Sequence, residues 1–211
     1  MPRSSSPRRG ASGQKPASTK NNGGQVRIIG GRWRSRKIEF PGANGLRPTG
    51  DRIRETLFNW LQQDVIGARC LDLFAGSGVL GIEAISRGAA HCTFIDNYEP
   101  ACSSLQQQLS TLNAEPAQAN VVRNDALNWL KTTKPVNQFD IAFIDPPFAQ
   151  DISASCCELL EASTVLSDNA LIYVETQRRP AGQQTPDNWQ QLRSKSSGQV
   201  TYSLYQRMKA L

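Results

Sequence analysis

The sequence predicts an α/β fold with a mostly parallel central sheet and helices on both faces. Three observations predict it. From residue 68 onward, short apolar runs typical of strands alternate with helical stretches. A glycine-rich turn follows the first of these runs. The last segment, residues 189–207, has the pattern of two strands that turn near Ser197 and Gly198, which would add an antiparallel hairpin to the sheet.

The basic charge is concentrated at the N-terminal end of the 211-residue chain. Residues 1–54 carry 13 Lys and Arg against two acids, whereas residues 55–211 carry 11 against 16 acids, for a net charge of +6. This asymmetry favours a polyanionic partner such as a phosphate backbone, although a solvated arm without a partner remains the alternative. Residues 1–24 contain no acid and almost nothing apolar. We expect them to form a disordered basic tail rather than a transit peptide, because they lack an amphipathic period.

Residues 25–63 are predicted to form a small basic extension that consists of a hairpin and a helix. Two short strands within residues 25–41 would meet near a pair of glycines. Because side chains of a strand alternate between its faces, Arg32, Arg34 and Arg36 would share one face.

A helix over residues 46–63 is predicted to follow Pro48, with Thr49 as its N-cap. Its apolar stripe is most simply core packing, and Arg52 and Arg54 would point away from that stripe. The stripe consists of Ile53, Leu57, Trp60 and Leu61.

Residues 64–211 are predicted to form one domain built from strand–helix–strand units. The predicted strands lie at 69–74, 92–96, 119–123, 139–145 and 170–175. The predicted helices lie at 78–87, 99–112, 125–132 and 152–165.

The composition disfavours several classes of protein. The chain lacks an apolar run of about 18 residues, so we expect a cytoplasmic protein that does not span a membrane. Its five cysteines form no CxxC pair and His91 is the only histidine. We therefore expect reduced thiols, no metal site and no histidine-based acid–base chemistry. The sequence does not fix the oligomeric state, and we expect a monomer.

A glycine loop lies between the first predicted strand of this domain and its first helix. Gly76, Gly78 and Gly81 form a GxGxxG pattern, and Asp96 ends the next strand 20 residues beyond Gly76, where an acid takes the hydroxyls of a ribose. The pattern predicts a nucleoside-containing cofactor. Asp72 would repel the pyrophosphate of a dinucleotide but suits the ammonium and sulfonium of S-adenosylmethionine. Alternatively, Asp72 only caps the amides of the loop.

The most specific signal is the turn Asp145-Pro146-Pro147-Phe148, which ends the fourth predicted strand. Two prolines stiffen the backbone, and the Pro146 carbonyl and the Asp145 carboxylate can accept both hydrogens of a planar amino group. Phe148 offers a face on which a base can stack. The alternative is an ordinary turn with a capping Asp and a core Phe.

These groups favour methyl transfer to an exocyclic base nitrogen. The acceptors stabilise this nitrogen most when it becomes positive in the transition state, and positioning supplies much of the rate. A base inside a duplex does not reach such a cleft, so the target is flipped out or single-stranded.

Several motifs together resemble the class I S-adenosylmethionine-dependent amino-methyltransferases, which implies a Rossmann-like fold. These motifs are Asp72-x-Phe-Ala-Gly-Ser-Gly, Asp96, Asn124-Asp125-Ala126 and Asp145-Pro-Pro-Phe148. Residues 26–207 are more specifically similar to the bacterial RsmD family, which methylates N2 of one guanine in 16S ribosomal RNA. The matching stretches are 27–34, 45–49, 51–60 and 198–207.

The resemblance implies a role for each motif, with ribosomal RNA or a small-subunit assembly particle as partner. The implied cofactor-binding residues are Asp72, Phe74, Ala75, Gly76, Ser77, Gly78, Asp96, Asn97, Asp125 and Ala126. The implied catalytic residues, which would hold the guanine, are Asp145, Pro146, Pro147 and Phe148. The implied RNA-binding residues are Arg27, Arg32, Arg34, Arg36, Arg47 and Arg52.

Other functions remain open at this point. The same turn would suit a methyltransferase that acts on adenine in nucleic acid or on a glutamine amide in a protein. A nucleotide-dependent oxidoreductase would explain the glycine pattern but not residues 145–148. A non-catalytic RNA-binding protein would explain only the basic leader.

Overall fold

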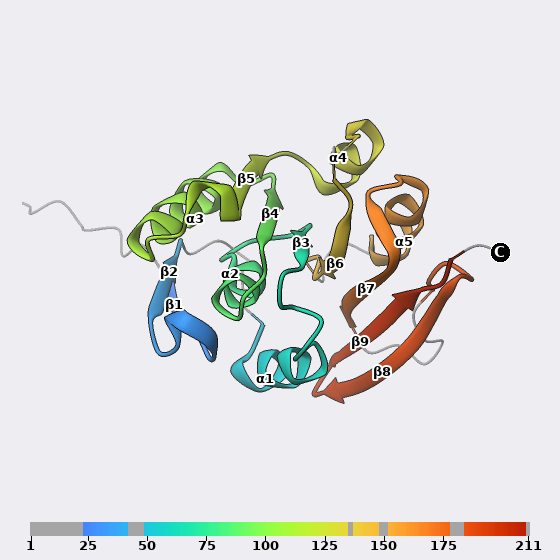
Figure 1. Ribbon diagram of the computed structural model, residues 1–211, viewed down its shortest axis with the longest axis horizontal. Helices are drawn as coiled ribbons and strands as arrows, with labels where there is room; N and C mark the ends of the chain where they lie inside the picture. The colour runs from blue at the N-terminus through green and yellow to red at the C-terminus, as the bar shows by residue number, and fades with distance from the viewer. Residues whose placement is uncertain (1–22, 42–48, 135–136, 148–151, 178–183, 210–211) are drawn as a thin grey trace, which may run out of the picture.

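The computed structural model describes residues 23–41, 49–134, 137–147, 152–177 and 184–209 (Figure 1). A seven-stranded sheet crosses the molecule in the order β5-β4-β3-β6-β7-β9-β8. Its strands are β3 (Arg69–Asp72), β4 (His91–Asp96), β5 (Ala119–Arg123), β6 (Phe139–Ile144), β7 (Leu166–Gln177), β8 (Trp189–Ser197) and β9 (Val200–Arg207).

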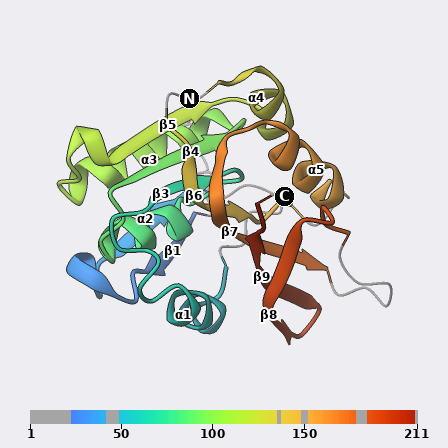
Figure 2. The ribbon, with the colours of Figure 1, turned by 45° about the vertical axis from the view of Figure 1, so that its right-hand side comes forward.

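The sheet is parallel from β5 to β7, and the last two strands are antiparallel. Strand β3 pairs with β4 and β6 in parallel, whereas β9 pairs antiparallel with both β7 and β8. Figure 2 shows the β8–β9 hairpin beyond β7 at one edge of the sheet. The predicted mixed sheet with an antiparallel C-terminal hairpin is therefore confirmed. Strand order reverses between β3 and β6, and such a reversal leaves a ligand crevice at the carboxyl ends of the strands.

Helices cover both faces of the sheet, as predicted. Cys70 and Phe143 pack on one face while the next residues, Leu71 and Ile144, pack on the other, as the strand period of two requires. The first face is covered by α1 (Asp51–Trp60), α2 (Val79–Ser86) and α3 (Glu99–Thr111). The second is covered by α4 (Ala126–Thr132) and α5 (Ser153–Ala162) (Figure 1).

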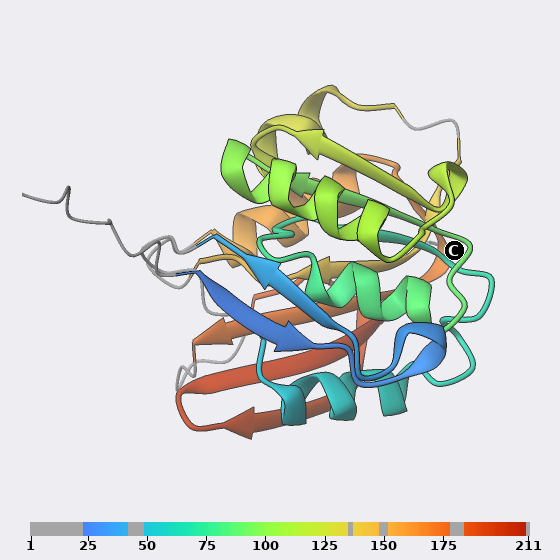
Figure 3. The same ribbon diagram turned by 90° about the vertical axis from the view of Figure 1, so that its left-hand side faces the viewer.

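The predicted hairpin of the extension exists, but the arginine face does not. Strands β1 (Gly24–Arg27) and β2 (Lys37–Phe40) form a separate antiparallel pair that lies beside α2 and α3 (Figure 3). Between them the chain forms the 3-10 helix η1 (Gly31–Trp33) and a turn. Gly31 and Ser35 have φ of 73° and 68°, which ends the extended backbone on both sides of Trp33.

The three arginines therefore do not share a strand face, so that expectation was wrong. The Trp33 side chain enters the core instead, and its backbone N–H donates to Ser86 Oγ at 3.0 Å. A single buried tryptophan thus overrides the local alternation of Arg32, Arg34 and Arg36 with other residues.

Helix α1 differs from the prediction in the residue at which it begins and in the burial of one of its arginines. Gly50 is the N-cap rather than Thr49, whose side chain donates elsewhere. Leu57 and Leu61 are buried as expected. Arg54 is also fully buried, so the expectation that it points away from the core was wrong.

A buried ion pair explains the position of Arg54. Its Nη1 donates to Glu83 Oε2 at 3.2 Å, and neither side chain is exposed. The Glu83 carboxylate also accepts from the backbone N–H groups of Ile29 and Gly30, at 2.9 and 2.7 Å. Helix α1, helix α2 and the segment after β1 therefore meet at one satisfied charge pair. The division of the chain at residues 63 and 64 stays a prediction.

All five cysteines are free and buried, in line with the expected reduced thiols. In the described parts of the chain, no helix has the length and apolar character that crossing a membrane requires. The same parts contain no group of three or more His, Cys, Asp or Glu placed to hold a metal ion. The expected tail falls mostly on residues 1–22, which lie outside the described residues.

Candidate functional site

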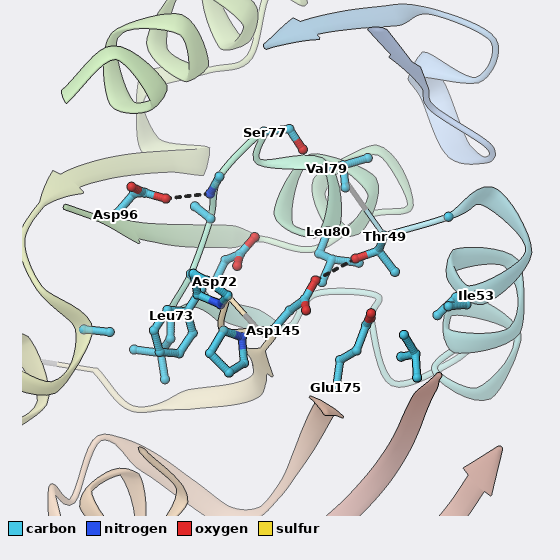
Figure 4. A pocket seen from close by; sticks show the side chains of 18 of the residues that line it. Thr49, Ile53, Asp72, Leu73, Ser77, Val79, Leu80, Asp96, Asp145 and Glu175 are labelled. Carbon is cyan, nitrogen blue, oxygen red and sulfur yellow. Dashed lines mark hydrogen bonds between the residues drawn. The ribbon is translucent and has the colours of Figure 1, made fainter. Parts of the chain in front are cut away.

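A cavity of about 990 Å³ lies at the carboxyl ends of strands β3 to β7 (Figure 4). Its size is at the upper end of the range typical of ligand pockets. The start of α1 and the turn between β8 and β9 complete its wall. The cavity therefore occupies the crevice that the reversal of strand order creates.

The glycine loop and Asp96 form one end of the cavity. The backbone N–H of Gly76 donates to Asp96 Oδ2 at 2.7 Å, and the N–H of Tyr98 donates to Oδ1 at 2.8 Å. These two bonds fix the carboxylate, and each oxygen keeps a further acceptor site. A pair of neighbouring hydroxyls, as in a ribose, fits this arrangement.

Nine of the ten residues expected to bind a cofactor line the cavity. They are Asp72, Phe74, Ala75, Gly76, Ser77, Asp96, Asn97, Asp125 and Ala126. Gly78 is not among the lining residues. It is the N-cap of α2 with φ of 73°, and a Cβ atom there would lie 2.3 Å from Leu105 Cδ1. Its lack of a side chain serves the turn and the packing of α3.

Asp72 combines the two roles that the sequence left open. Its Oδ2 accepts from the N–H of Gly81 at 3.2 Å, so it does cap the loop. It also lines the cavity although it is buried. Burial raises the pKa of this carboxyl to about 7, with smaller contributions from Asp145 and Asp96. A cationic ligand beside Asp72 would favour its ionised form.

Asp125, between β5 and α4, also lines the cavity. It is the N-cap of α4, and its Oδ1 accepts from the N–H of Asn128 at 2.9 Å. Its carboxylate is exposed, and Ala126 beside it is buried. Asn97 and Asn124 add amide groups to the same wall. This wall can form hydrogen bonds with the polar edge of a nucleobase.

The Asp-Pro-Pro turn forms the wall on the other side of β3 from Asp96. Asp145, Pro146 and Pro147 all line the cavity, whereas Phe148 lies outside the described residues. The Thr49 hydroxyl donates to Asp145 Oδ2 at 2.8 Å (Figure 4). Burial raises the pKa of Asp145 above its usual range. The turn is thus held by Thr49, the residue before the N-cap of α1.

Sequence reasoning missed Glu175, which ends up beside Asp145. Glu175 lies near the carboxyl end of β7, is 4% exposed and lines the cavity. The Tyr173 hydroxyl donates to its Oε2 at 2.8 Å. Burial and the nearby Asp145 raise the pKa of Glu175. The available signal was an acid at the carboxyl end of a predicted central strand, next in the sheet to the strand that carries the Asp-Pro-Pro turn.

The described lining of the cavity is strongly acidic. Arg52 is its only basic residue. Its acids are Asp51, Asp72, Asp96, Asp125, Asp145 and Glu175. This charge disfavours a pyrophosphate and suits a cationic ligand.

The arginines expected to bind RNA are scattered. Arg27 Nη2 lies 3.7 Å from Asp51 Oδ2. Arg32 Nη2 donates to Gln118 Oε1 at 2.6 Å. Arg36 Nη2 donates to the Thr111 carbonyl at 2.7 Å. Arg34 is exposed, and of the described members only Arg52 reaches the cavity. Arg47 lies outside the described residues.

A second cleft of about 440 Å³ adjoins the cavity. The two share Arg52 and Ser197, and the cleft adds Lys195 from β8. Lys195 is a cation that the sequence analysis did not single out. Exposed cations thus stand at the mouth of an acidic cavity.

Comparison with known proteins places the chain in a family. Residues 26–206 match the family model described as Conserved hypothetical protein 95. The chain is 47% identical over 184 residues to Ribosomal RNA small subunit methyltransferase D of Escherichia coli (strain K12), which covers 87% of this chain and 91% of that protein. It is 45% identical over 193 residues to the protein of the same name from Haemophilus influenzae, covering 91% and 99%.

Solved structures agree with the fold. A putative methyltransferase, yhhF from Escherichia coli, superposes with a TM-score of 0.80 at 45% identity and covers 88% of this chain and 99% of that one. SMU.776, a putative methyltransferase complexed with SAH, has a TM-score of 0.60 at 19% identity, covers 80% and 53%, and supports the fold alone. The predicted Rossmann-like class I methyltransferase fold is therefore confirmed, and the chain belongs to the RsmD-type methyltransferases of the Conserved hypothetical protein 95 family.

Proposed function

We propose that this protein transfers a methyl group from S-adenosylmethionine to the exocyclic N2 of a guanine in small-subunit (16S) ribosomal RNA. One observation carries the proposal: a single cavity joins the glycine loop with Asp96 to the Asp145-Pro146 turn. A nucleoside cofactor and a planar amine would meet there. The names of the relatives support ribosomal RNA as the substrate class.

The residues at the glycine-loop end fit a cationic nucleoside. Asp72 provides a carboxylate for an ammonium or sulfonium group, and Asp96 provides two fixed acceptors for ribose hydroxyls. Asp125 and its neighbours face the base. When bound, S-adenosylmethionine supplies an activated methyl group on a positively charged sulfur. The acidic lining argues against the pyrophosphate that a dinucleotide-dependent oxidoreductase would need.

The residues at the other end fit an aromatic amine. The Thr49 hydroxyl occupies Asp145 Oδ2, and within the described residues no donor occupies Oδ1. Oδ1 and the Pro146 carbonyl would therefore accept the two N–H groups of the amine and aim its nitrogen at the methyl group. Both acceptors bind more strongly as the nitrogen becomes positive, which favours the transition state over the bound substrate. The released proton leaves through Asp145 or water.

The substrate strand would enter past Arg52 and Lys195. Arg52 and Lys195 lie where the cavity meets the adjoining cleft, so they can contact phosphates while the target base is flipped inward. We assign the protein to the cytoplasm, acting as a monomer on ribosomal RNA or on a small-subunit assembly particle.

Nucleoside analysis tests the proposal. The protein is incubated with methyl-labelled S-adenosylmethionine and either 16S ribosomal RNA lacking the modification or assembled small-subunit particles from the same cells. Label on 2-methylguanosine in either substrate is the expected result. Label on methyladenosine or on a protein glutamine, or no label in any substrate, would contradict it.

A further inference from the structure

The cavity contains a second buried carboxyl directly beside the Asp-Pro-Pro turn. Strands β6 and β7 run in parallel with Ile144 opposite Val174, and the next residues are Asp145 and Glu175. The preceding pair, Phe143 and Tyr173, packs on the face covered by α1 to α3. Since alternate residues share a face, Asp145 and Glu175 point to that face too. Figure 4 shows both carboxyl groups directed into the space beside Thr49.

One oxygen of Glu175 is held and the other is free to bind. The Tyr173 hydroxyl occupies Oε2 at 2.8 Å. Within the described residues Oε1 has no hydrogen-bond partner. It is not among the unpaired polar atoms that are fully shielded from solvent, so a ligand can reach it. Because the tyrosine hydroxyl can either donate to Oε2 or accept from it, Oε1 is an acceptor whether or not the carboxyl is ionised.

A carboxyl in this place would cost free energy without a donor to pair with. Of the groups on this wall, Asp145 repels it and Tyr173 satisfies only one oxygen. The missing partner is an N–H group from a ligand, next to the amine that Asp145 accepts. On guanine the N1–H lies directly beside the N2 amino group, on the same edge of the base. On adenine the ring nitrogen beside the amino group is an acceptor, which would face Oε1 with like polarity.

We propose that Glu175 is a specificity-determining residue that accepts the N1–H of guanine while Asp145 accepts from its N2 amino group. The inference rests on the proposed function and adds the group that rejects bases lacking an N1–H. A site with a buried acceptor discriminates strongly against a ligand that leaves this acceptor unpaired.

The test compares guanine with 2-aminopurine, which keeps the N2 amino group but lacks the N1–H. Each base is placed in RNA at the labelled guanine, which nuclease fragments of the labelled RNA locate, and kcat/KM is measured for both RNAs. We expect the wild-type protein to prefer guanine by about 100-fold or more. In Glu175→Gln the side-chain amide can donate to the bare N1 of 2-aminopurine, so the preference should fall below about 10-fold.

A matched variant controls for general effects of the exchange. Glu158→Gln changes the same side chain at an exposed position of α5 and should keep the wild-type preference. If Glu175→Gln turns over too slowly, the affinities for the two RNAs with S-adenosylhomocysteine present give the same comparison. Melting temperature and cofactor affinity show whether the variant is folded.

The outcomes separate the two proposals. A wild-type preference for guanine that persists unchanged in Glu175→Gln overturns the role of Glu175 and leaves the proposed function intact. A wild-type protein that methylates no guanine N2 overturns the proposed function, and the role of Glu175 falls with it. The inference is supported if the preference for guanine over 2-aminopurine collapses in Glu175→Gln and persists in Glu158→Gln.

Discussion

The carboxyl group of Asp72 lies where its negative charge does not stabilise the ligand-free fold. Asp72 is buried, and its pKa of about 7 lies far above the 3.8 of an exposed aspartate. The hydrogen bond from the Gly81 N–H, at 3.2 Å, and the contribution of the Phe74 backbone do not offset the loss of water. A cation bound beside it would reverse this balance. Such residues trade stability for binding.

The stability of the ligand-free protein should reflect this cost. The unfolded chain loses the Asp72 proton near pH 4, whereas the folded protein keeps it up to about pH 7, so stability falls as the pH rises through this window. Asp72→Asn keeps an oxygen for Gly81 N–H and should raise stability at pH 8 by up to about 4 kcal/mol. The same variant should weaken binding of S-adenosylmethionine. Thermal melting at pH 5 and 8 checks this, with exposed Asp187→Asn as the control; an unchanged melting temperature at pH 8 would contradict it.

At the scale of elements, one charge pair links the N-terminal extension to the side of the sheet that carries the cavity. Arg54 of α1 and Glu83 of α2 are both fully buried and hydrogen-bonded. Arg54 Nε also donates to the Thr49 carbonyl at 3.1 Å, and the Thr49 hydroxyl holds Asp145. The extension therefore positions the wall of the cavity as well as covering the core.

Breaking this pair should destabilise the protein strongly. Arg54→Ala removes the fully buried cation from Glu83 and leaves that carboxylate paired only with Arg87 Nε, at 2.9 Å; breaking a buried pair typically costs about 3–5 kcal/mol. Arg52→Ala, two positions earlier on the same helix, removes an exposed arginine and should change stability by less than about 0.5 kcal/mol. Urea unfolding of both variants measures the difference. Equal losses of stability would show that the buried pair contributes nothing specific.

The parts of the fold that the sequence predicted are those governed by local pattern. The buried parallel strands read as apolar runs, and Asp72, Asp96 and Asp145 follow such runs, so their meeting at one sheet edge was predictable. Residues 31–36 were mispredicted because Trp33 is drawn into the core by partners more than fifty positions away. The burial of Arg54 likewise depends on Glu83, 29 residues distant.

At the scale of the whole molecule, charge is separated between an acidic cavity and a basic rim. Arg52 and Lys195 come from α1 and β8, which are far apart in sequence, and they meet in the cleft beside the cavity. A polyanion would be held by this rim, while the interior stays suited to a cationic cofactor. On the proposed function, this arrangement would steer an RNA strand toward the cavity without attracting its phosphates inside.

Salt dependence measures the contribution of the rim. Each phosphate contact of a single strand adds about 0.7 to the slope of log affinity against log salt concentration. Arg52→Ala and Lys195→Ala should each lower the magnitude of the slope for RNA binding by about that amount. Lys131→Ala, an exposed lysine of α4 on the other side of the sheet, serves as the control. Slopes that do not change in the two rim variants would move the phosphate contacts to another surface.

The central claim is that the turn after β6 holds the reacting amine next to a cofactor held by other residues. The most direct measurement is single-turnover methyl transfer by Asp145→Ala, together with its affinity for S-adenosylmethionine. The rate should fall by about 100-fold or more, because an acceptor that acts on the transition state is lost, while the cofactor affinity should stay within about threefold. Transfer at the wild-type rate by Asp145→Ala, with the variant folded and the cofactor bound, would contradict the account.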